Sequence, residues 1–522
     1  MSPLKWWENA VIYQIYPRSF QDSNNDGIGD LNGITSRLNY IADLGVDAIW
    51  ISPFFMSPQY DFGYDVSNYC DINPEYGTLS DFDNLIQKTH KLGLRLMIDI
   101  VPAHCSSLHP WFEESRQSRE NPKADWFHWV DPKPDGSPPN NWLSFFGGLA
   151  WSWEPRRQQY YLHNFLPQQP NLNHANTQVR DELDKIARFW FDRGVDGFRL
   201  DAVHTINGDT PPYRDNLADP NFVLGPLPQD KQPFFRQLHD VAQLNQPVIQ
   251  EFSSAYRKIA EEYDGDRFLM GEVDGDEGNA MNVSKTFSEP GRLHATYNFD
   301  LLEWSGLTVL GLKEAISKAI EVFNGSGRLC FAFSNHDVPR SATRQLEPLE
   351  ISVNKQDDLQ LLLLQLETSL IGSTCVYQGE ELGLSDVIDI PVNKMKDPWG
   401  INFYPEFLGR DTCRTPMVWD KKQSMGGFTS SNQSWLPIAE SHLEKAALEM
   451  AKNTKSVYSR FSKFLKWRKK QPAMMQANIM SEVSGGPKEI IFDRMSGYQK
   501  LRCKFDFEMV KATFEEVQNG TS

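Results

Sequence analysis

The feature that most restricts the folds open to this chain is a unit that recurs along it: an amphipathic helix, a glycine, then an apolar strand. Apolar residues three and four positions apart give each helix one hydrophobic face. The glycine can take the left-handed conformation that ends helices, because it has no β-carbon. Helices that alternate with buried strands predict parallel βαβ units. The unit is clearest where Gly45, Gly93 and Gly194 precede strands at 48–51, at 94–101 and ending at Asp201.

Apolar strands recur often enough to suggest a closed barrel. Eight can be counted, which is the number in a (β/α)8 TIM barrel, so we predict an α/β fold of that kind. The active site of such a barrel lies at the C-terminal ends of its strands. A doubly wound parallel sheet is the alternative that the pattern alone leaves open. The expected strands lie near Val11, Ile49, Ile98, Phe198, Leu269, Tyr297, Phe331 and Val376.

Acidic residues stand at the ends of three of these apolar segments. Asp201 ends GFRLD, Glu272 ends FLMGE and Asp337 ends FAFSNHD, and the three are about equally far apart in the sequence. Residues two apart on a strand share a face, so Arg199 is expected to hold Asp201 ionised. A carboxylate at a strand end is a candidate nucleophile. The regular spacing indicates that the three acids meet on one face of the barrel.

Two stretches depart from the helix–strand repeat. Residues 105–173 contain no such unit and are rich in Trp, Pro, Asn and Gly, which predicts a subdomain inserted after the third barrel strand. Beyond about residue 472, short apolar runs such as EIIF predict a small β domain. The expected organisation is a barrel made of residues 1–104 and 174–472, an inserted subdomain at 105–173, and a short C-terminal β domain at 473–522.

Charge and composition exclude several classes of partner. The formal net charge of −17 repels nucleic-acid phosphates and anionic lipids, so neither nucleic acid nor a membrane is an expected partner. The chain shows no apolar run long enough for a membrane span and no signal-peptide core. A cytoplasmic location is expected, with secretion after removal of a signal peptide as the alternative. The six cysteines lack metal-site spacing and are expected to be free thiols.

Several separate motifs together resemble those of the α-amylase family of glycoside hydrolases, in its branch of oligo-1,6-glucosidases and α-glucosidases. The resemblance extends from about residue 11 to about residue 470. QPNLN at 169–173 is similar to a segment that marks this branch, although Asn171 replaces an aspartate. The other motifs are DIVPAH ending at His104, GFRLD ending at Asp201, GE ending at Glu272, SNHD ending at Asp337, and RD with RTPM between Arg410 and Met417.

The resemblance implies a retaining hydrolysis of α-glucosidic bonds. Asp201 would attack the anomeric carbon and form a glucosyl ester, while Glu272 would protonate the leaving oxygen and later deprotonate water. This division requires a protonated Glu272 beside an ionised Asp201, with the carboxyl groups about 5–5.5 Å apart. Asp337 would bind sugar hydroxyls and favour ring distortion. Small α-glucosides are the implied substrates, bound by Asp61, Tyr64, His104, Phe146, Phe165, Arg199, His336 and Arg410.

The same resemblance bears on specificity. A pair between Arg410 and Asp61 would close the site beyond the terminal sugar and make the enzyme exo-acting. Ala202 follows the nucleophile, where a small residue accompanies α-1,4 preference and a valine accompanies α-1,6 preference, so maltose-like substrates or sucrose are expected. Two alternatives stay open: a sucrose isomerase or glucosyl transferase, and a non-catalytic relative that binds sugar or belongs to a transporter. Ala103, where the family usually has asparagine, keeps the second one open.

A polar loop at 22–30 (DSNNDGIGD) is a candidate metal site. Its oxygen donors alternate around a glycine turn, as in the first half of an EF-hand loop. The twelfth position is Gly33 rather than a glutamate, so the loop is not a complete EF-hand, and a solvated polar turn is the alternative interpretation. The resemblance implies a structural calcium ion here. Its ligands would be Asp22, Asn24, Asp26, the carbonyl of Ile28, and Asp30.

Overall fold

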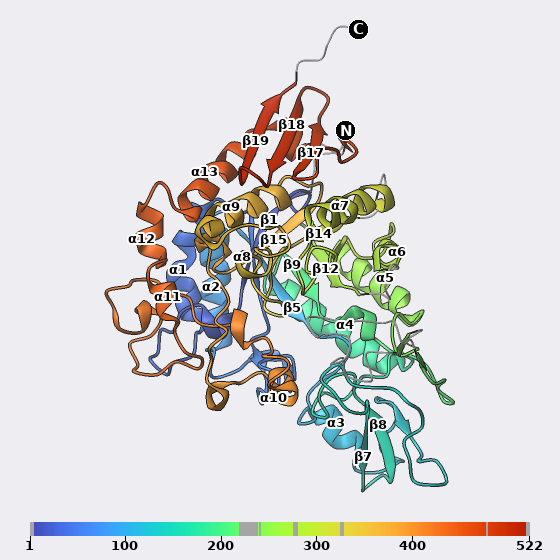
Figure 1. The fold of residues 1–522 in the computed structure, drawn as a ribbon. Coiled ribbons are helices and arrows are strands. Elements are labelled where there is room, and N and C mark those ends of the chain that lie inside the picture. Colours follow the sequence, from blue (N-terminus) through green and yellow to red (C-terminus); the bar gives the residue numbers. More distant parts are fainter. Residues whose placement is uncertain are drawn as a thin grey trace.

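At the centre of the molecule eight parallel strands form a closed barrel, in the order β1-β15-β14-β13-β12-β9-β5-β2 (Figure 1). The computed structural model describes residues 5–218, 238–239, 242–274, 280–323, 328–476 and 479–517. The eight predicted strands all belong to this barrel, so the TIM barrel is confirmed and the doubly wound alternative is wrong. The barrel strands are β1 (Val11–Ile15), β2 (Ala48–Ile51), β5 (Arg95–Ile100), β9 (Gly197–Leu200), β12 (Phe268–Glu272), β13 (Ala295–Tyr297), β14 (Leu329–Phe331) and β15 (Ser373–Tyr377).

Helices surround the barrel, and their ends follow local sequence signals. The helix α1 begins after Asp30, whose side chain accepts a hydrogen bond from the N–H of Gly33, and it ends at Gly45 with a φ of 100°. Gly93 and Gly194 also have positive φ, of 77° and 95°, which confirms the predicted left-handed glycines. The main helices are α1 (Leu31–Leu44), α2 (Leu79–Lys91), α4 (Thr177–Asp192), α5 (Val248–Glu261), α6 (Ala280–Phe287), α7 (Val309–Phe323), α9 (Gln356–Glu367) and α13 (Val457–Arg468).

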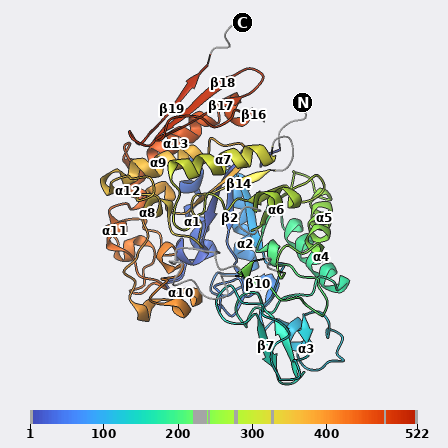
Figure 2. The same ribbon diagram turned by 45° about the vertical axis from the view of Figure 1, so that its right-hand side comes forward.

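The chain leaves the barrel between β5 and β9 and forms the predicted inserted subdomain. A three-stranded antiparallel sheet, in the order β6-β8-β7, lies with α3 at one end of the molecule (Figures 1 and 2). Aromatic rings fill its centre, where Phe112 lies 5.0 Å from both Phe127 and Tyr161 between ring centroids. The elements are α3 (Pro110–Ser115), β6 (Trp129–Val130), β7 (Trp151–Glu154) and β8 (Gln159–Leu162); a short pair, β3 (Phe55–Met56) and β4 (Asn68–Ile72), precedes β5.

A four-stranded antiparallel sheet follows the last helices, at the end of the molecule opposite the inserted subdomain (Figures 1 and 2). Its apolar residues share one buried cluster with residues of α7 and α9, which attaches the sheet to the barrel. The expected C-terminal β structure is therefore present. Its strands are β16 (Ile479–Met480), β17 (Glu489–Met495), β18 (Lys500–Asp506) and β19 (Lys511–Glu516). Shorter elements are α8 (Ser341–Arg344), α10 (Pro398–Phe403), α11 (Glu440–Leu443), α12 (Ala447–Lys452), α14 (Pro472–Met475), β10 (Leu217–Ala218) and β11 (Leu238–His239).

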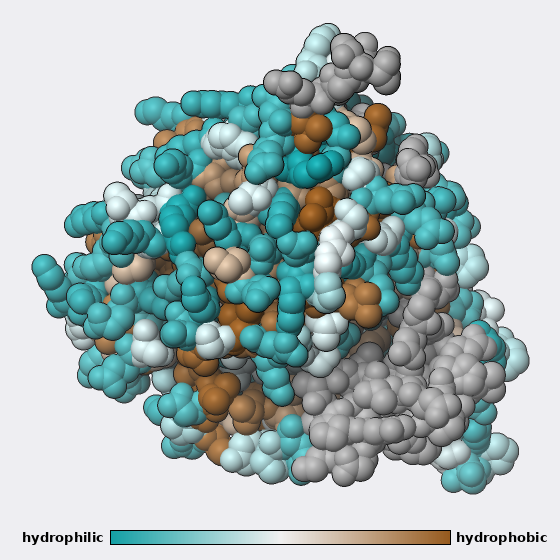
Figure 3. All heavy atoms as spheres, turned by 45° about the horizontal axis from the view of Figure 1, so that its top comes forward, coloured by the Kyte–Doolittle hydropathy of each residue, from teal (hydrophilic) through white to brown (hydrophobic). Residues whose placement is uncertain are grey.

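The barrel interior is packed with apolar side chains. Ile12, Trp50, Met97, Met270 and Tyr297, from five barrel strands, belong to one buried cluster. Strands buried on both faces are typical of parallel barrels, so polar groups gather at the strand ends. The face in Figure 3 is mainly hydrophilic, and no helix in the described part of the chain is long and apolar enough to cross a membrane. The six cysteines are free thiols, as predicted.

Candidate active site

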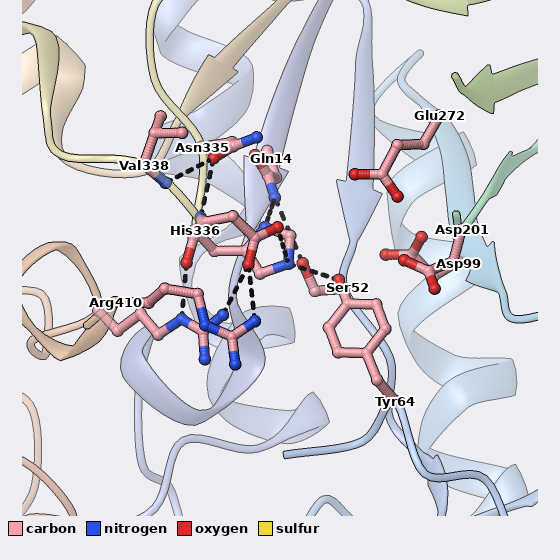
Figure 4. Close-up of polar contacts among 12 residues, drawn as sticks. Gln14, Ser52, Tyr64, Asp99, Asp201, Glu272, Asn335, His336, Val338 and Arg410 are labelled. Atoms are coloured by element: carbon pink, nitrogen blue, oxygen red, sulfur yellow. Dashed lines mark hydrogen bonds and ion pairs between the residues drawn. The ribbon is translucent and has the colours of Figure 1, made fainter. Parts of the chain in front are cut away.

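The acidic residues predicted to meet lie at the C-terminal ends of the barrel strands. Asp201 directly follows β9 and Glu272 ends β12, and these two strands are paired neighbours in the barrel. Asp337 follows β14 and the short segment 332–336. In the view of Figure 4 the carboxyl groups of Asp201, Glu272 and Asp99 gather on one side of the site. These groups lie at the same end of the barrel because the C-terminal ends of all its parallel strands point in one direction.

Arg199 holds three carboxyl groups at this rim. Its Nη1 lies 2.9 Å from Oδ1 of Asp99 and 2.5 Å from Oδ1 of Asp201, and its Nη2 lies 2.8 Å from Oε1 of Glu272. The strand register explains part of this arrangement, since Arg199 is paired with Asp99 of the neighbouring strand β5. The contact with Asp201 is the one predicted from their spacing of two residues. One guanidinium group therefore binds both the candidate nucleophile and the candidate acid–base group.

Burial sets the protonation of this cluster. Burial raises the pKa of Asp201 well above its ordinary value; Arg199 lowers it, and the charges of Glu272 and Asp99 raise it further. Burial also raises the pKa of Asp99 to about 7, although Arg199 opposes the rise. Arg199 therefore favours the ionised form of Asp201, as expected from the sequence, while burial and the neighbouring carboxyl groups oppose it. One cation thus faces three carboxyl groups, and the raised pKa of Asp99 follows from burial together with this shortage of positive charge.

The turn after β9 links the two candidate catalytic groups. Ala202 has a left-handed backbone, with a φ of 43°, and its N–H donates a hydrogen bond to Oε2 of Glu272 at 2.7 Å. A positive φ at a residue with a β-carbon stores strain, and such residues cluster at active sites. The turn at Ala202 therefore supplies a backbone N–H that binds the carboxyl group of Glu272.

Asp337 occupies a more cationic environment than Asp201. Its Oδ1 accepts hydrogen bonds from Nη1 of Arg410 at 3.1 Å and from Nη2 of Arg414 at 2.8 Å. Burial would raise its pKa, but its interaction with the His336 ring and the charges of Arg410 and Arg414 together lower it below the ordinary value. Burial lowers the pKa of His336 to about 3, so His336 is neutral at neutral pH and the arginines supply the positive charge. Asp337 is therefore a carboxylate able to accept hydrogen bonds from hydroxyl groups.

His336 and Tyr64 stack beside this carboxylate. The side-chain amide of Gln14 donates to Nδ1 of His336 at 2.8 Å, which places the ring proton on Nε2. That nitrogen lies 2.5 Å from the hydroxyl oxygen of Tyr64, and the two rings are 5.5 Å apart with an interplanar angle of 7°. In Figure 4 the pair lies between the carboxyl cluster and Arg410. Both residues thus have fixed orientations next to the candidate catalytic groups.

The predicted pair of Arg410 and Asp61 is present. Nη2 of Arg410 lies 2.9 Å from Oδ1 of Asp61, and both side chains are almost fully buried. The other oxygen of Asp61 accepts a hydrogen bond from Gln169 at 3.0 Å. Gln169 also lies 3.2 Å from Nε2 of His104, which itself lies 3.1 Å from the carbonyl oxygen of Tyr64. Residues from four distant segments are therefore connected at this end of the site.

Two rings from the inserted subdomain form the apolar side of the site. The ring of Phe165 lies 5.2 Å from that of His104 and 5.6 Å from that of Phe146, between centroids. The guanidinium carbon of Arg410 lies 4.9 Å from the centre of the Phe146 ring, a cation–π contact. The structure thus brings together all the residues that the sequence predicted for catalysis and substrate binding.

Three charged residues of this network were not predicted as site residues, nor were the amides Gln14 and Gln169. Asp99 begins the DIVPAH motif and Arg414 begins RTPM, so their places in these motifs were the available signal. Asp397 lies outside all the family motifs, and only its contact with Arg410 in the structure shows that it belongs to the site. Asp99, Arg414 and Asp397 are all charged partners of predicted residues. A charged partner has no local sequence pattern of its own, whereas Asp201, Glu272 and Asp337 each end an apolar segment.

The predicted metal loop folds around its own side chains. Oδ1 of Asp22 accepts hydrogen bonds from the N–H groups of Asn24 and Asn25 at 2.9 and 2.7 Å. Burial raises the pKa of Asp30; hydrogen bonds from Ser23 and Gly33 lower it, and the charge of Asp22 raises it. A divalent cation would relieve this repulsion, and the carboxylate, amide and carbonyl oxygens suit a hard ion such as Ca²⁺. The types of donor therefore suit such an ion, although the described residues contain no cluster of three or more His, Cys, Asp or Glu side chains arranged to hold a metal.

Known proteins share this architecture over almost the whole chain. Residues 14–477 match the family described as alpha amylase, catalytic domain. A probable alpha-glucosidase from Rhizobium meliloti is 46% identical over 515 residues, which cover 98% of this chain and 91% of that protein. The crystal structure of the alpha-glucosyl transfer enzyme XgtA is 43% identical with a TM-score of 0.91, and the match covers 97% of this chain and 92% of that chain. A mutant isomaltulose synthase from Erwinia rhapontici NX5, in complex with sucrose, is 32% identical with a TM-score of 0.86, over 97% and 91% of the two chains.

Proposed function

The chain belongs to the alpha-amylase family and is a glycoside hydrolase of the α-glucosidase type, and we propose that it is a retaining, exo-acting enzyme that releases glucose from the non-reducing ends of short α-glucosides. The observation that carries the proposal is the contact of one guanidinium group, that of Arg199, with both Asp201 and Glu272. It keeps the two carboxyl groups close together, as retaining glycosidases require.

In the first step Asp201 attacks the anomeric carbon of the terminal glucose. A bond forms between its carboxylate oxygen and that carbon, while the glycosidic oxygen leaves and takes the proton of Glu272. This step requires Glu272 to carry the proton and Asp201 to be ionised, which is the division of roles in a retaining mechanism. The positive charge of Arg199 stabilises the carboxylate form of Asp201.

In the second step water replaces the leaving group. Glu272, now ionised, takes a proton from the water, whose oxygen attacks the anomeric carbon and releases Asp201 as a carboxylate. Glucose leaves with the configuration of the substrate. Asp337, held ionised by Arg410 and Arg414, binds hydroxyl groups of the sugar and favours the distorted ring of the transition state.

The exo-action of the enzyme is supported by the pair of Arg410 and Asp61. Arg410 binds both Asp61 and Asp337, so this pair would close the site after one sugar unit. Tyr64, His104 and His336 would surround that sugar, with Phe146 and Phe165 as its apolar walls. Ala202 next to the nucleophile favours α-1,4 bonds, so maltose-like substrates or sucrose are the proposed substrates.

Transfer of the glucosyl group to a sugar is the second candidate function. It uses the same ester on Asp201, with a sugar hydroxyl in place of water. The likeness to an alpha-glucosyl transfer enzyme at 43% identity favours this candidate. An acceptor sugar in the assay separates the two functions, because transfer yields a new disaccharide and less free glucose.

We also propose that the loop 22–30 binds calcium through Asp22, Asn24, Asp26, Asp30 and the carbonyl of Ile28. The ion would fix the loop between β1 and α1 and take no part in the chemistry. The hydroxyl of Thr429 donates a hydrogen bond to Oδ2 of Asp22, so the loop is tied to a distant segment of the chain. An ion there would stabilise both segments together.

The test is glucose release from maltose, isomaltose and sucrose by the unaltered protein and by an Asp201→Asn variant. We expect release from maltose, with the α-anomer of glucose formed first in the NMR spectrum, and no release by the variant. A β-anomer formed first would contradict the retaining mechanism. Absence of release from all three sugars would contradict the proposed function as a whole.

A further inference from the structure

Asp397 is a fully buried carboxylate that the proposed mechanism does not use. Its side chain is 0% exposed, so it cannot touch a sugar. Its Oδ1 accepts hydrogen bonds from Nε of Arg410 at 3.0 Å and from Nη2 at 2.7 Å, and its Oδ2 accepts one from the backbone N–H of Arg410 at 2.7 Å. A buried carboxylate that makes charge-assisted hydrogen bonds to one arginine fixes the plane and direction of its guanidinium group.

The remaining donors of Arg410 face the substrate-binding residues. Nη2 also reaches Asp61 at 2.9 Å, and Nη1 reaches Asp337 at 3.1 Å. A free arginine side chain has many rotamers, and ordering it costs conformational entropy. The contacts with Asp397 anchor the inner edge of the guanidinium group, which leaves its outer edge aimed at the two carboxylates. Without this anchor, Asp61 and Asp337 would have to position Arg410 by themselves.

The same carboxylate connects Arg410 to the inserted subdomain. Asp397 caps the N-terminus of α10, where its Oδ1 accepts a hydrogen bond from the N–H of Trp399 at 3.3 Å. Further along α10, the side chain of Asn402 donates to the carbonyl oxygen of Phe146 at 3.1 Å. The ring of Phe146 in turn packs on Arg410. Asp397 therefore stands where α10, the Phe146 segment and Arg410 meet.

We propose that Asp397 is a positioning residue for the closed end of the site: it orients Arg410 so that Arg410 binds Asp61 and Asp337 in the geometry that receives the terminal sugar. This inference rests on the proposed α-glucosidase function. It assigns a role in substrate affinity to a side chain that never touches the substrate.

The first test is an Asp397→Asn variant. Asparagine is about as good a helix N-cap as aspartate, so the variant keeps the start of α10. It removes the charge that binds Arg410 and replaces the oxygen that accepts the backbone N–H of Arg410 with an amide NH2 group. We expect KM for 4-nitrophenyl α-glucoside to rise about ten-fold or more, the effect of losing a charge-assisted hydrogen bond, while kcat changes less than about three-fold. Asp389→Asn is the matched control, because Asp389 is an exposed aspartate of the same segment, and its KM should not change.

The second test asks whether Asp397 acts through Arg410. In an Arg410→Ala background, Asp397→Asn should raise KM little further, because the group that it positions is already absent. An equal rise in both backgrounds would overturn the proposal, and so would an unchanged KM in the single Asp397→Asn variant. If Asp397→Asn does not fold by circular dichroism, Arg410→Lys replaces it, since lysine keeps the charge but cannot contact all three carboxylates at once. A wild-type KM for that variant would equally overturn the positioning role.

The unaltered protein separates failure of this inference from failure of the function. If it releases no glucose from any α-glucoside, the proposed function is wrong. If it is active and Asp397→Asn has the same KM as Asp389→Asn, the function stands and only the positioning role is wrong.

Discussion

Nη1 of Arg199 lies 2.5 Å from Oδ1 of Asp201, and the two residues are only two positions apart at the end of one barrel strand. Local sequence is enough to create this contact. The same guanidinium group also binds Asp99 and Glu272, which come from the two neighbouring strands. This local pair is therefore the centre of a buried cluster of four charged residues.

The first prediction identifies the nucleophile. A 2-deoxy-2-fluoro glucosyl fluoride should form a slowly hydrolysed ester, seen by mass spectrometry as one added sugar on the peptide that contains Asp201. The Asp201→Asn variant should gain no sugar and lose at least roughly 10³-fold in kcat. A label on Glu272 instead would reverse the roles assigned to the two carboxyl groups.

The second prediction concerns the stability supplied by Arg199. Replacing it with methionine leaves three carboxyl groups buried without their cation, so the free energy of unfolding should fall by about 3–5 kcal/mol. Denaturant unfolding measures this change. Arg188→Met is the matched control, because Arg188 forms an exposed ion pair with Glu262, for which we expect a loss of about 1 kcal/mol or less. Similar losses in both variants would show that the cluster contributes no special stability.

The third prediction is a pH dependence that comes from Asp99. Its folded-state pKa of about 7 lies above the value of about 3.9 in an unfolded chain. Its contribution to stability is therefore fully present below about pH 4 and is lost as the pH rises through 7. An Asp99→Asn variant lacks this loss, so its Tm relative to the wild type should increase between pH 4 and pH 8. Parallel curves of Tm against pH for the two proteins would contradict the raised pKa.

The fourth prediction concerns linkage preference. An Ala202→Val variant adds two methyl carbons beside the nucleophile, and we expect the ratio of kcat/KM for isomaltose to that for maltose to rise about ten-fold. The control is Ala451→Val, which makes the same change at an exposed residue near the end of α12. If the ratio is the same in all three proteins, Ala202 does not determine the preference.

The fifth prediction concerns calcium. If the loop 22–30 binds Ca²⁺, an ion concentration 100 times the Kd stabilises the fold by about 2.7 kcal/mol, so a chelator should lower Tm and added calcium should restore it. An Asp26→Asn variant should respond less, because it lacks one ligand carboxylate while the buried Asp22 and Asp30 stay in place. An identical response of variant and wild type would place the ion elsewhere.

Much of the architecture could be predicted because it is encoded by neighbours in the sequence. Helical spacing followed by Gly45, Gly93 and Gly194 marked the βαβ units, and these glycines do have positive φ. Eight apolar strands implied a closed barrel, and a barrel gathers its strand ends at one rim, so Asp201, Glu272 and Asp337 could be placed together. Apolar residues repeat every two positions in a strand and every three to four positions in a helix, so short stretches of sequence are enough to predict these elements.

Only the tertiary structure decided which carboxyl groups bind each arginine of the site. Arg410 binds Asp61 across a separation of 349 residues, and no local pattern could show that Asp397 anchors the same arginine. The spacing of Arg199 and Asp201 predicted an ionised carboxylate, but burial raises its pKa and two further carboxyl groups compete for the same cation. Desolvation and long-range pairing depend on which distant segments pack together. The sequence by itself therefore determined the barrel and the identity of its acidic residues, and the packing decided their protonation and the partners that hold them.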